Sequence, residues 1–487
     1  MSEPVSITNN PFAGALYCVR CFGCQMNKHD AEVIAGLLNG LGMTATDDTA
    51  DAAVIVFLTC CVREGAEERL RGQVASLKQL KTADDGSWLP ADDAPLVAVG
   101  GCIGQRDGAE LLKLLPHTDV VFGTQNIQRL PALLHDAHAR RSARTSGERY
   151  TDSATVETVE ASDAFAADLP TVRKHPWHAW LPITQGCNNF CSYCIVPYVR
   201  GREKSRPLER IVEQAETLVA DGVREITLLG QNVNSYGRDR YGTPRFAEAL
   251  AAVAATGVER LGFATSHPKD LLDETIAVMG RTPQILRYLH LPVQSGSDRV
   301  LQAMNRHYTG ADYRRLVCKL RAAVPDIALS TDLIVGFPGE TERDFADTLQ
   351  LVREVEFDQA FTFLFSPRAK TPAATMPDQV PADVAQERFE RLVDAVQAGA
   401  RAGNERLVGT RQDVLVEGAS KRDAQVLVGR DRHYKVCHFP LPAGNTAADW
   451  QGRTVAVRVA AAHTWYLDVE PSAPGAGAAT HDPATGE

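Results

Sequence analysis

The first 130 residues alternate short runs of apolar, mostly β-branched residues with helical patterns. The runs are Leu16–Val19, Ala53–Leu58 and Leu96–Val99. Apolar residues three and four apart follow the first two runs, at Val33, Ile34, Leu37, Leu38 and Leu41 and then at Leu70, Val74, Leu77 and Leu80. This spacing predicts amphipathic helices, the first of which ends at Gly42. Strands that alternate with helices indicate an α/β fold with a doubly wound parallel sheet, which we place at residues 14–130.

Six further strand-like runs, each followed by a helical stretch, occupy residues 173–408. They are Ala179–Thr184, Glu225–Leu229, Arg260–Ala264, Tyr288–Val293, Leu329–Val335 and Gln359–Phe365. Six strand–helix units predict an open (βα)6 partial barrel, a shortened relative of the eight-fold barrel. In such barrels the chemistry lies at the carboxyl ends of the strands, so the residues just after each run are the candidate site residues.

The remaining segments have different patterns. Residues 131–172 are rich in Ala, Ser, Thr, Asp and Glu without a sustained period, and we expect a linker or surface loop there. Valines alternate with other residues between 410 and 471, with Gly and Pro between the runs, which predicts a small β-barrel. The last segment, 472–487, is rich in Ala, Pro and Gly and is expected to be disordered.

The composition is that of an ordinary globular protein, with 44% hydrophobic and 23% charged residues, which excludes disordered, collagen-like and coiled-coil classes. No apolar run approaches the roughly 18 residues of a membrane span, and the N-terminus lacks a signal-peptide pattern. We therefore expect a cytoplasmic protein, and a monomer. The net charge of −10 argues against nucleic-acid binding by the chain as a whole. Eleven cysteines are an odd number, and in a cytoplasmic chain clustered cysteines indicate metal or redox chemistry rather than disulfides.

Cys187, Cys191 and Cys194 form a Cys-x3-Cys-x2-Cys group directly after the first strand of the predicted barrel. Clustered thiolates favour an iron–sulfur cluster or zinc. A structural zinc site normally has four protein ligands, so three local cysteines leave one metal position open for a small molecule. The alternatives are a zinc knuckle with a distant fourth ligand such as His178, or buried cysteines without a metal.

Cys24, Cys60 and Cys102 each follow a predicted strand and precede a predicted helix. In a parallel sheet such positions share the carboxyl edge, where ligands bind, and helix N-termini favour the thiolate. We interpret them as the ligands of a second iron–sulfur cluster with one open position. Three unconnected buried thiols are equally compatible with the strand placement alone.

The motifs around these cysteines resemble those of the radical S-adenosylmethionine (SAM) methylthiotransferase family. The N-terminal motifs are Phe22–Asn27, Thr59–Glu64 and Val99–Cys102. The similarity continues through Thr184–Asn189, Ile195–Pro197, Gly230–Asn234, Leu291–Ser297 and Asp332–Glu340, and it covers residues 14–125 and 173–470. The C-terminal barrel resembles the RNA-binding TRAM domain. Within the family, Gly23–Asn27 is similar to the branch that acts on tRNA carrying N6-isopentenyladenosine beside the anticodon, at the position known as 37.

This resemblance implies two 4Fe–4S clusters, with two SAM molecules used per turnover. The group at Cys187 would hold the cluster that binds SAM, and the group at Cys24 would hold an auxiliary cluster. It also implies transfer of a methylthio group to C2 of the modified adenosine. The C2–H bond is neither acidic nor electrophilic, so the reaction needs a radical, and we assign no side chain as a catalytic acid or base.

Other substrates and classes stay open at this point. Other branches of the family act on threonylcarbamoyl-adenosine in tRNA or on a ribosomal-protein side chain. A zinc-dependent RNA-binding module without catalysis is the alternative of a different class. The implied partners, besides the tRNA anticodon stem-loop, are an electron donor of the flavodoxin or ferredoxin type and the iron–sulfur assembly machinery.

Polar residues and glycines at the predicted strand ends are the candidates for SAM binding. They are Gln231, Asn232, Ser266, Gln294, Asp332, Gly336 and Gly339. Glycines at these points let the backbone approach a ligand closely. His267 is interpreted as structural. The segment Arg200–Arg206 is interpreted either as a solvated charged turn or as a contact for the SAM carboxylate or a phosphate.

Three features depart from the family pattern. Leu58 stands where Asn is usual, Cys61 where Ala is common, and two further cysteines precede Cys24. Cys21 or Cys61 is therefore a conceivable substitute ligand. The remaining cysteines are interpreted as structural, namely Cys18, Cys318 and Cys437.

Two segments are basic relative to the whole chain. Residues 172–210 carry seven Arg or Lys and two Glu, and residues 410–470 carry eight basic and seven acidic residues. Basic patches attract RNA phosphates with salt-dependent affinity, while the unpaired anticodon-loop bases provide sequence readout. The candidate RNA contacts are Lys421, Arg422, Arg430, Arg432 and Lys435, and a solvated surface charge is an equal alternative for each.

Overall fold

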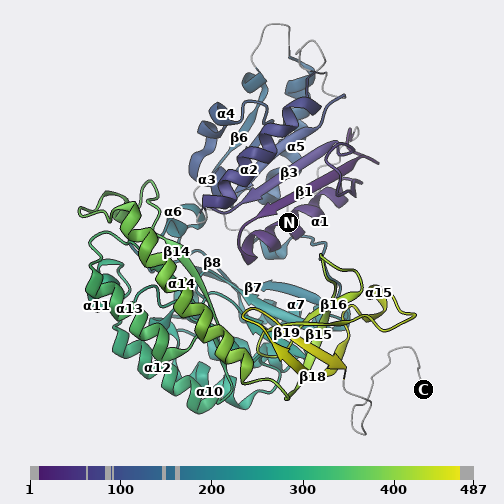
Figure 1. The fold of residues 1–487 in the computed structure, drawn as a ribbon. Helices are drawn as coiled ribbons and strands as arrows, with labels where there is room; N and C mark the ends of the chain where they lie inside the picture. Colours follow the sequence, from purple (N-terminus) through teal and green to yellow (C-terminus); the bar gives the residue numbers. More distant parts are fainter. Residues whose placement is uncertain are drawn as a thin grey trace. The chain divides into compact units, whose positions relative to one another are not determined.

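The structure is a computed structural model that describes residues 10–61, 64–82, 89, 93–144, 150–159 and 165–471. The chain divides into two compact units, the first formed by Met1–Gln214, Thr227–Arg245 and Ser366–Thr375, and the second by Ala215–Ile226, Phe246–Phe365 and Met376–Glu487 (Figure 1). The tail predicted to be disordered, 472–487, lies outside the described residues. Within the described ranges, no helix has the length and apolar character needed to cross a bilayer.

The N-terminal part of the first unit is a six-stranded sheet with the order β2-β1-β3-β4-β5-β6. The strands are β1 (Leu16–Phe22), β2 (Thr44–Ala45), β3 (Val54–Thr59), β4 (Leu96–Gly101), β5 (Val120–Phe122) and β6 (Thr155–Glu157). Every neighbouring pair is parallel. The predicted doubly wound parallel sheet is confirmed.

Helices cover both faces of this sheet (Figure 1). One face packs on α1 (Gln25–Gly40) and α5 (Leu130–Ser142), and the other on α2 (Glu64–Ser76), α3 (Cys102–Asp107) and α4 (Leu111–Leu114). Side chains alternate along β3, so that Val54 and Val56 enter the first core whereas Ile55 and Phe57 enter the second. Short 3-10 turns complete this part, at η1 (Leu77–Leu80), η2 (Gly108–Glu110), η3 (Ile127–Arg129), η4 (Tyr150–Ser153) and η5 (Ala166–Asp168).

The expectation of a linker over 131–172 is wrong for much of that stretch. Most of α5 lies in it, and β6 extends the sheet beyond β5. Leu133, Leu134 and Ala137 of α5 are fully buried against the strands. The sequence did not predict α5 and β6 because the segment is polar overall and only one narrow side of α5 is apolar.

The predicted partial barrel consists of two three-stranded sheets, with the orders β11-β10-β7 and β12-β13-β14. Its strands are β7 (His178–Pro182), β10 (Glu225–Leu229), β11 (Arg260–Phe263), β12 (Tyr288–His290), β13 (Ala328–Val335) and β14 (Gln359–Leu364). The two short strands β8 (Thr184–Gln185) and β9 (Lys204–Ser205) pair with each other. A parallel bridge between Leu261 and Ile285 links β11 to the segment before β12. All six predicted runs therefore form strands, and β10 contains the point where the chain passes from the second unit to the first.

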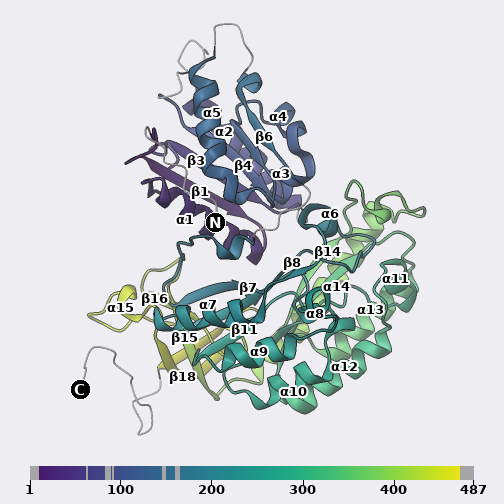
Figure 2. The ribbon, with the colours of Figure 1, turned by 180° about the vertical axis from the view of Figure 1, so that it is seen from behind.

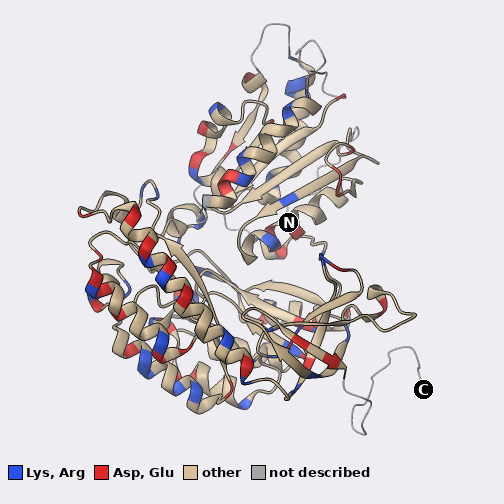
Figure 3. Cartoon of the chain, viewed as in Figure 1, with Lys and Arg blue, Asp and Glu red and all other residues tan. Residues whose placement is uncertain are grey.

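Helices follow each of these strands. They are α6 (Val196–Arg200), α7 (Leu208–Ala220), α8 (Arg238–Tyr241), α9 (Phe246–Ala254), α10 (Asp273–Arg281), α11 (Asp298–Ala303), α12 (Gly310–Ala323), α13 (Glu342–Val355) and α14 (Ala382–Glu405), with 3-10 turns η6 (Val233–Ser235), η7 (Pro268–Asp270) and η8 (Pro372–Thr375). Figure 2 shows α9, α10 and α12 side by side on the outside of the second unit. Basic and acidic residues are interspersed along α13 and α14 (Figure 3), and α14 carries ion pairs one turn apart such as Arg391–Glu387.

The C-terminal part of the second unit is a closed five-stranded barrel with the order β15-β16-β17-β19-β18. The strands are β15 (Arg411–Ala419), β16 (Val426–Arg430), β17 (Val436–Pro440), β18 (Thr454–Ala462) and β19 (Leu467–Pro471), with the short helix α15 (Ala447–Trp450) before β18. Inward-facing residues such as Val414, Leu427 and Val457 alternate with outward-facing ones, and they form one core. The small β-barrel predicted from the alternating valines is confirmed.

Candidate functional site

The three N-terminal candidate cysteines lie at one edge of the six-stranded sheet. Phe22 is in register with Thr59, and Thr59 with Gly101, so β1, β3 and β4 end level with one another. Cys24 lies at the start of α1, Cys60 directly follows β3, and Cys102 is the first residue of α3. The strand order therefore brings these residues to the carboxyl edge, as expected for a parallel sheet.

The cysteines at this edge interact in pairs. A hydrogen bond with Cys60 lowers the pKa of Cys24 to about 6, against the opposing effect of burial. In the same way a hydrogen bond with Cys61 lowers the pKa of Cys102 to about 7. The nearby guanidinium of Arg200 lowers both values further. The edge thus favours thiolates, which are the form that binds metals.

Two glycines make this crowding possible. A side chain at Gly23 would lie 2.9 Å from Cβ of Cys60, and Gly101 has φ +82°, which L-residues rarely adopt. Asn27 is fully buried, and its Oδ1 accepts a hydrogen bond at 3.1 Å from Cys24 when that residue is a thiol, while its Nδ2 has no hydrogen-bond partner in the described part of the chain. A buried amide N–H without a partner is costly, and the sulfur atoms of a bound cluster would satisfy it.

In the described ranges, no three His, Cys, Asp or Glu side chains converge closely enough to hold a single metal ion. An iron–sulfur cubane does not require such convergence, because each thiolate binds a different iron atom. The thiolate character of Cys24 and Cys102 and the unpartnered amide of Asn27 fit that larger group.

The second cysteine loop follows β8. Gly186 precedes Cys187 with φ +76°, and a Cβ there would lie 2.1 Å from the carbonyl oxygen of Arg202. The backbone N–H of Gly186 donates to Oε1 of Gln231 at 2.5 Å, and that of Cys187 donates to the carbonyl of Gly201 at 3.1 Å. Gln231, one of the predicted SAM residues, therefore lies under the cysteine loop.

Further contacts fix this loop. Phe190 adopts φ 48° and packs its ring edge-on against Tyr198 and beneath the guanidinium of Arg202, 4.3 Å from the ring centre. Cys194 N–H donates to the carbonyl of Cys191 at 2.9 Å. His178, the alternative fourth zinc ligand, has its Nε2 within hydrogen-bond distance of Thr227 Oγ1, at 3.2 Å, and is buried against Trp180.

Most of the other predicted SAM residues follow strand ends, as expected, whereas Asp332 lies inside β13. Asn232 is buried after β10 in the first unit. In the second unit Ser266 follows β11, and its buried hydroxyl has no hydrogen-bond partner within the described residues. Gln294 follows β12 with φ 73°, and its N–H donates to the carbonyl of Asp332 at 2.9 Å. The Asp332 carboxylate lies 3.4 Å from Nε2 of His290.

The loop Gly336–Gly339 after β13 is fixed by hydrogen bonds and a buried ion pair. Gly336 and Gly339 have φ 76° and 77°. The N–H of Gly336 donates to Glu340, whose carboxylate pairs with the buried Arg388 of α14 at 3.1 Å. Burial raises the pKa of Glu340 to about 7, although Arg388 opposes the rise. The loop is therefore a rigid backbone surface at the strand end rather than a free turn.

His267 and the two ends of the charged segment Arg200–Arg206 are buried and have partners within the protein. The structural role of His267 is confirmed, because its Nδ1 accepts from the N–H of Lys269 and caps η7. The interpretation of Arg200–Arg206 as a solvated charged turn is wrong for the two ends of the segment. Arg200 pairs with Asp30 at 2.6 Å and Arg206 with Asp168 at 2.9 Å, and both arginines are buried. Opposite charges distant in sequence supply these partners.

The unassigned cysteines have distinct surroundings. Cys18 lies in the core beneath the sheet and Cys437 in the barrel core, whereas Cys318 is exposed on α12. Burial raises the pKa of Cys21 to about 12, which disfavours its thiolate as a substitute ligand. Cys61 is fully buried and in hydrogen-bond contact with Cys102.

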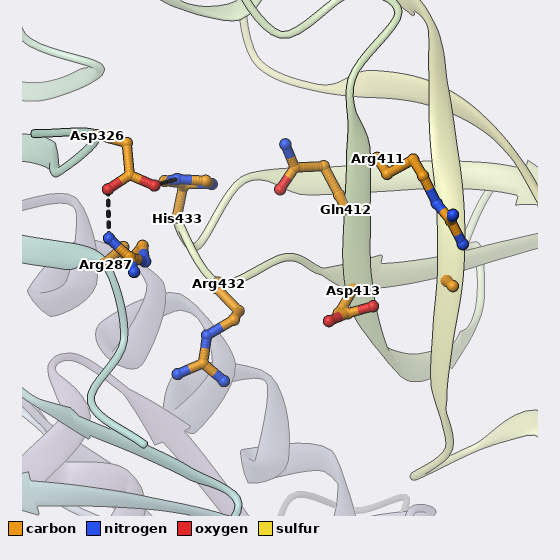
Figure 4. Close-up of a pocket in the computed structure, with 8 residues that line it drawn as sticks. Arg287, Asp326, Arg411, Gln412, Asp413, Arg432 and His433 are labelled. Carbon is orange, nitrogen blue, oxygen red and sulfur yellow. Dashed lines mark hydrogen bonds and ion pairs between the residues drawn. The ribbon is translucent and has the colours of Figure 1, made fainter. Parts of the chain in front are cut away.

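Three of the five candidate RNA contacts are engaged within the second unit. Arg430 pairs with Glu417 at 2.8 Å and Lys435 with Asp358 at 2.6 Å. Arg432 donates to the carbonyls of Pro283 and Ile285 and lines a cavity of about 390 Å³ (Figure 4). The other two candidates, Lys421 and Arg422, are exposed.

The cavity in Figure 4 lies at the amino ends of β12 and β13, the ends opposite to those that precede Gln294 and Gly336. Its lining residues are Arg287, Asp326, Arg411, Gln412, Asp413, Arg432, His433 and Ala456. Asp326 accepts from Arg287 at 2.5 Å and lies 3.3 Å from Nε2 of His433. These ion pairs connect the segments before β12 and β13 with the loop between β16 and β17.

Sequence patterns did not identify Asn27, Asp30 and Arg200 as neighbours of the cysteines. Asn27 and Asp30 lie three and six residues after Cys24, on the first turns of α1, and both are buried. Polar residues on the buried side of a predicted helix could have indicated that they contact the site. Arg200 was hidden because a charged segment normally indicates solvent.

Family models match three parts of the chain. Residues 16–123 match the uncharacterized protein family UPF0004, residues 181–352 match the Radical SAM superfamily, and residues 405–470 match the TRAM domain. These matches cover the first five strands of the six-stranded sheet, most of the partial barrel and the closed five-stranded barrel.

The chain is also similar to individual proteins. The tRNA-2-methylthio-N(6)-dimethylallyladenosine synthase of Acetivibrio thermocellus is 43% identical over 93% of this chain and 90% of its own length. The protein of the same name from Caldicellulosiruptor saccharolyticus is 47% identical over 86% of each chain. Among solved structures, the radical SAM methyltransferase TsrM of Kitasatospora setae has a TM-score of 0.50 at 13% identity, over 74% of this chain and 77% of that one. This last similarity concerns the fold alone.

Proposed function

The chain belongs to the family of tRNA-2-methylthio-N(6)-dimethylallyladenosine synthases, and from this premise we propose how its two cysteine groups divide the reaction. The enzyme is a radical SAM methylthiotransferase that modifies tRNA. It uses SAM and an iron–sulfur cluster. We propose further that it holds two 4Fe–4S clusters and consumes two SAM molecules per turnover.

In this proposal Cys187, Cys191 and Cys194 hold the cluster that binds SAM. When bound and reduced, such a cluster would give one electron to SAM and so supply the radical chemistry that a C2–H bond of adenine requires. Gln231 supports the cysteine loop through Gly186 at 2.5 Å. Ser266, Gln294 and the Gly336–Gly339 loop are the proposed SAM contacts of the second unit, and hydrogen bonds fix the backbone of Gln294 and of the glycine loop.

Cys24, Cys60 and Cys102 would hold the auxiliary cluster, where the sulfur that becomes the methylthio group is bound. The observation that carries this assignment is their common position at the level ends of β1, β3 and β4. The buried Asn27 amide beside them provides a hydrogen-bond donor for a sulfur atom. Three protein ligands leave one iron of a cubane open to a small sulfur ligand.

The proposal also includes partners. The TRAM domain is expected to contact the tRNA through exposed residues such as Lys421 and Arg422, rather than through the arginines engaged inside the second unit. Single-electron reduction of the cluster needs a donor of the flavodoxin or ferredoxin type, and the clusters need the assembly machinery. These requirements fit a cytoplasmic enzyme.

Iron and sulfide counting on anaerobically reconstituted protein tests the two-cluster assignment. Wild type should bind about eight irons, and Cys24→Ala and Cys187→Ala should each bind about four. Zinc in place of iron, or loss of both clusters in either variant, would contradict the assignment.

Incubation with SAM, reductant and dimethylallyl-modified tRNA tests the activity. Mass spectrometry of the nucleosides should show the gain of one sulfur and one CH2 on N6-dimethylallyladenosine. A gain on threonylcarbamoyl-adenosine instead, with none on the dimethylallyl substrate, would overturn the substrate assignment.

A further inference from the structure

One buried arginine connects the two cysteine groups. Arg200 ends α6, six residues after Cys194, yet its side chain lies against the N-terminal cysteines rather than its own loop. It is 5% exposed, and the preceding residue, Val199, packs with Cys61 and Cys102 in one buried cluster. The charge of Arg200 acts on both Cys102 and Cys24. Its Nη2 lies 2.6 Å from Oδ2 of Asp30, which is 2% exposed.

The backbone around Arg200 is fixed on both sides. Thr124 Oγ1 donates to the carbonyl of Val199 at 2.6 Å, and Gln125 Nε2 donates to that of Arg200 at 3.3 Å. The next carbonyl, of Gly201, accepts from the N–H of Cys187 at 3.1 Å. The segment Val199–Gly201 is therefore bound both by the loop after β5 and by the second cysteine loop.

A buried guanidinium in this place has a defined electrostatic effect. An unpaired buried charge is costly, and Asp30 alone would neutralise it. Asp30 lies 2.6 Å from the guanidinium, and the thiolates of Cys24 and Cys102, as cluster ligands, would add further negative charge beside it. A fixed cation in a low-dielectric site favours any step that adds negative charge nearby, including reduction of a bound cluster.

We propose that Arg200 is a positioning residue of the N-terminal cysteine group, which orients the Cys102 sulfur and raises the reduction potential of the cluster held there. The inference rests on the proposed function, because it requires a cluster at Cys24, Cys60 and Cys102. It assigns to a residue of the radical SAM region the control of the auxiliary centre's charge.

Redox titration of the auxiliary cluster alone tests this role. The background variant carries Cys187→Ala, Cys191→Ala and Cys194→Ala, so that the signal of one cluster is followed by electron paramagnetic resonance. Arg200→Gln keeps hydrogen-bond donors but removes the charge, and its midpoint potential should shift to more negative values. Arg200→Lys restores the charge and should recover most of the shift.

Two control variants separate charge from structure. Arg206→Gln removes a buried arginine of the same segment that pairs with Asp168 and carbonyl oxygens instead of the cysteines. It should lower the melting temperature without moving the potential. Cys61→Ala removes the neutral donor on Cys102 and should give a smaller negative shift than Arg200→Gln.

Asp30→Asn tests the direction of the shift in reduction potential, and this test does not require the Arg200→Gln variant to fold. Loss of this negative charge leaves Arg200 uncompensated, so the potential should shift to more positive values. Equal potentials in Arg200→Gln, Asp30→Asn and the background, with the cluster retained, would overturn the inference and leave the proposed function standing. A background variant that binds no cluster would instead overturn the two-cluster assignment itself.

Discussion

A single glycine controls the cysteine loop of the first unit. Gly186→Ala should destabilise the protein for two reasons. Alanine in the left-handed conformation of this position is strained by about 1–2 kcal/mol. In addition, its Cβ would lie 2.1 Å from the carbonyl oxygen of Arg202, and such overpacking costs about 1–3 kcal/mol. Denaturant unfolding measures the loss, and iron counting should show depletion at Cys187, Cys191 and Cys194.

Gly222→Ala is the matched control for this substitution. Gly222 has φ +86°, but no atom lies within 4 Å of the position that a Cβ would take, so only the backbone strain applies, about 1–2 kcal/mol. Equal losses in the two variants would show that the Arg202 carbonyl moves aside without cost.

Glu32 gives the protein a residue-level dependence on pH. Burial raises its pKa to about 7, and the Lys174 N–H that it accepts at 3.1 Å opposes the rise only partly. The folded state therefore favours the protonated form. Its contribution to stability is fully present below pH 4.5 and is lost as pH rises through 7.

Glu32→Gln keeps the acceptor and removes this titration. The free energy of unfolding should fall between pH 4.5 and 8 more steeply in wild type than in the variant, by about 1–3 kcal/mol. Parallel pH profiles for the two proteins would contradict the role of burial at this carboxyl.

For single residues, the sequence predicted where a side chain lies in the fold better than which side chain it pairs with. The order of strands brings Cys24, Cys60 and Cys102 to one edge because each follows a run whose hydrophobic pattern is unambiguous. The partners of Arg200 and Lys435, by contrast, are Asp30 and Asp358, at sequence separations that no local pattern encodes. For that reason the sequence could not show that these two cations are engaged inside the protein.

Helix α1 shows how a tertiary contact overrides helix propensity. Gly36 lies in the helix interior, where Ala is intrinsically better by about 1 kcal/mol. A Cβ there would lie 2.2 Å from the carbonyl oxygen of Pro170, in a segment that also binds α1 through the Val172 N–H. Gly36→Ala should therefore destabilise the protein.

Gly40→Ala, in the last position of the same helix, is the control. Nothing lies within 4 Å of the added methyl group, so the change should be neutral or stabilising by up to about 1 kcal/mol. Thermal unfolding of both variants checks the difference, and stabilisation by both would show that Pro170 is not held against α1.

Helices and strands were predictable from the sequence where the periodic segment was long or its apolar content was high. β3 and β4 are buried on every residue and β10 coincides with its predicted run. The strands β5 and β6 have three residues each, too few for a period to emerge. β5 pairs with β4, and β6 pairs with β5, so the existence of both strands depends on neighbours that only the folded sheet supplies.

For the whole molecule, the division of basic residues between internal and exposed positions predicts how tRNA binding depends on salt. Replacing Lys421 and Arg422 by Ala should weaken tRNA binding and reduce the slope of log K against log salt by about 1–2. Arg430→Ala should lower the melting temperature, because it breaks the pair with Glu417 and the contact with the Tyr434 ring, and should leave that slope unchanged. Filter binding over a range of salt concentrations distinguishes the two; a reduced slope for Arg430→Ala alone would reverse the assignment.

The order β15-β16-β17-β19-β18 closes on itself, so each strand of the C-terminal barrel has two hydrogen-bonded neighbours. A chain that stopped at Ala462 would lack β19 and would leave β17 and β18 each with a row of unsatisfied amides along one side. Such rows are templates for another polypeptide, so we expect a stop codon shortly before β19 to make the truncated protein insoluble.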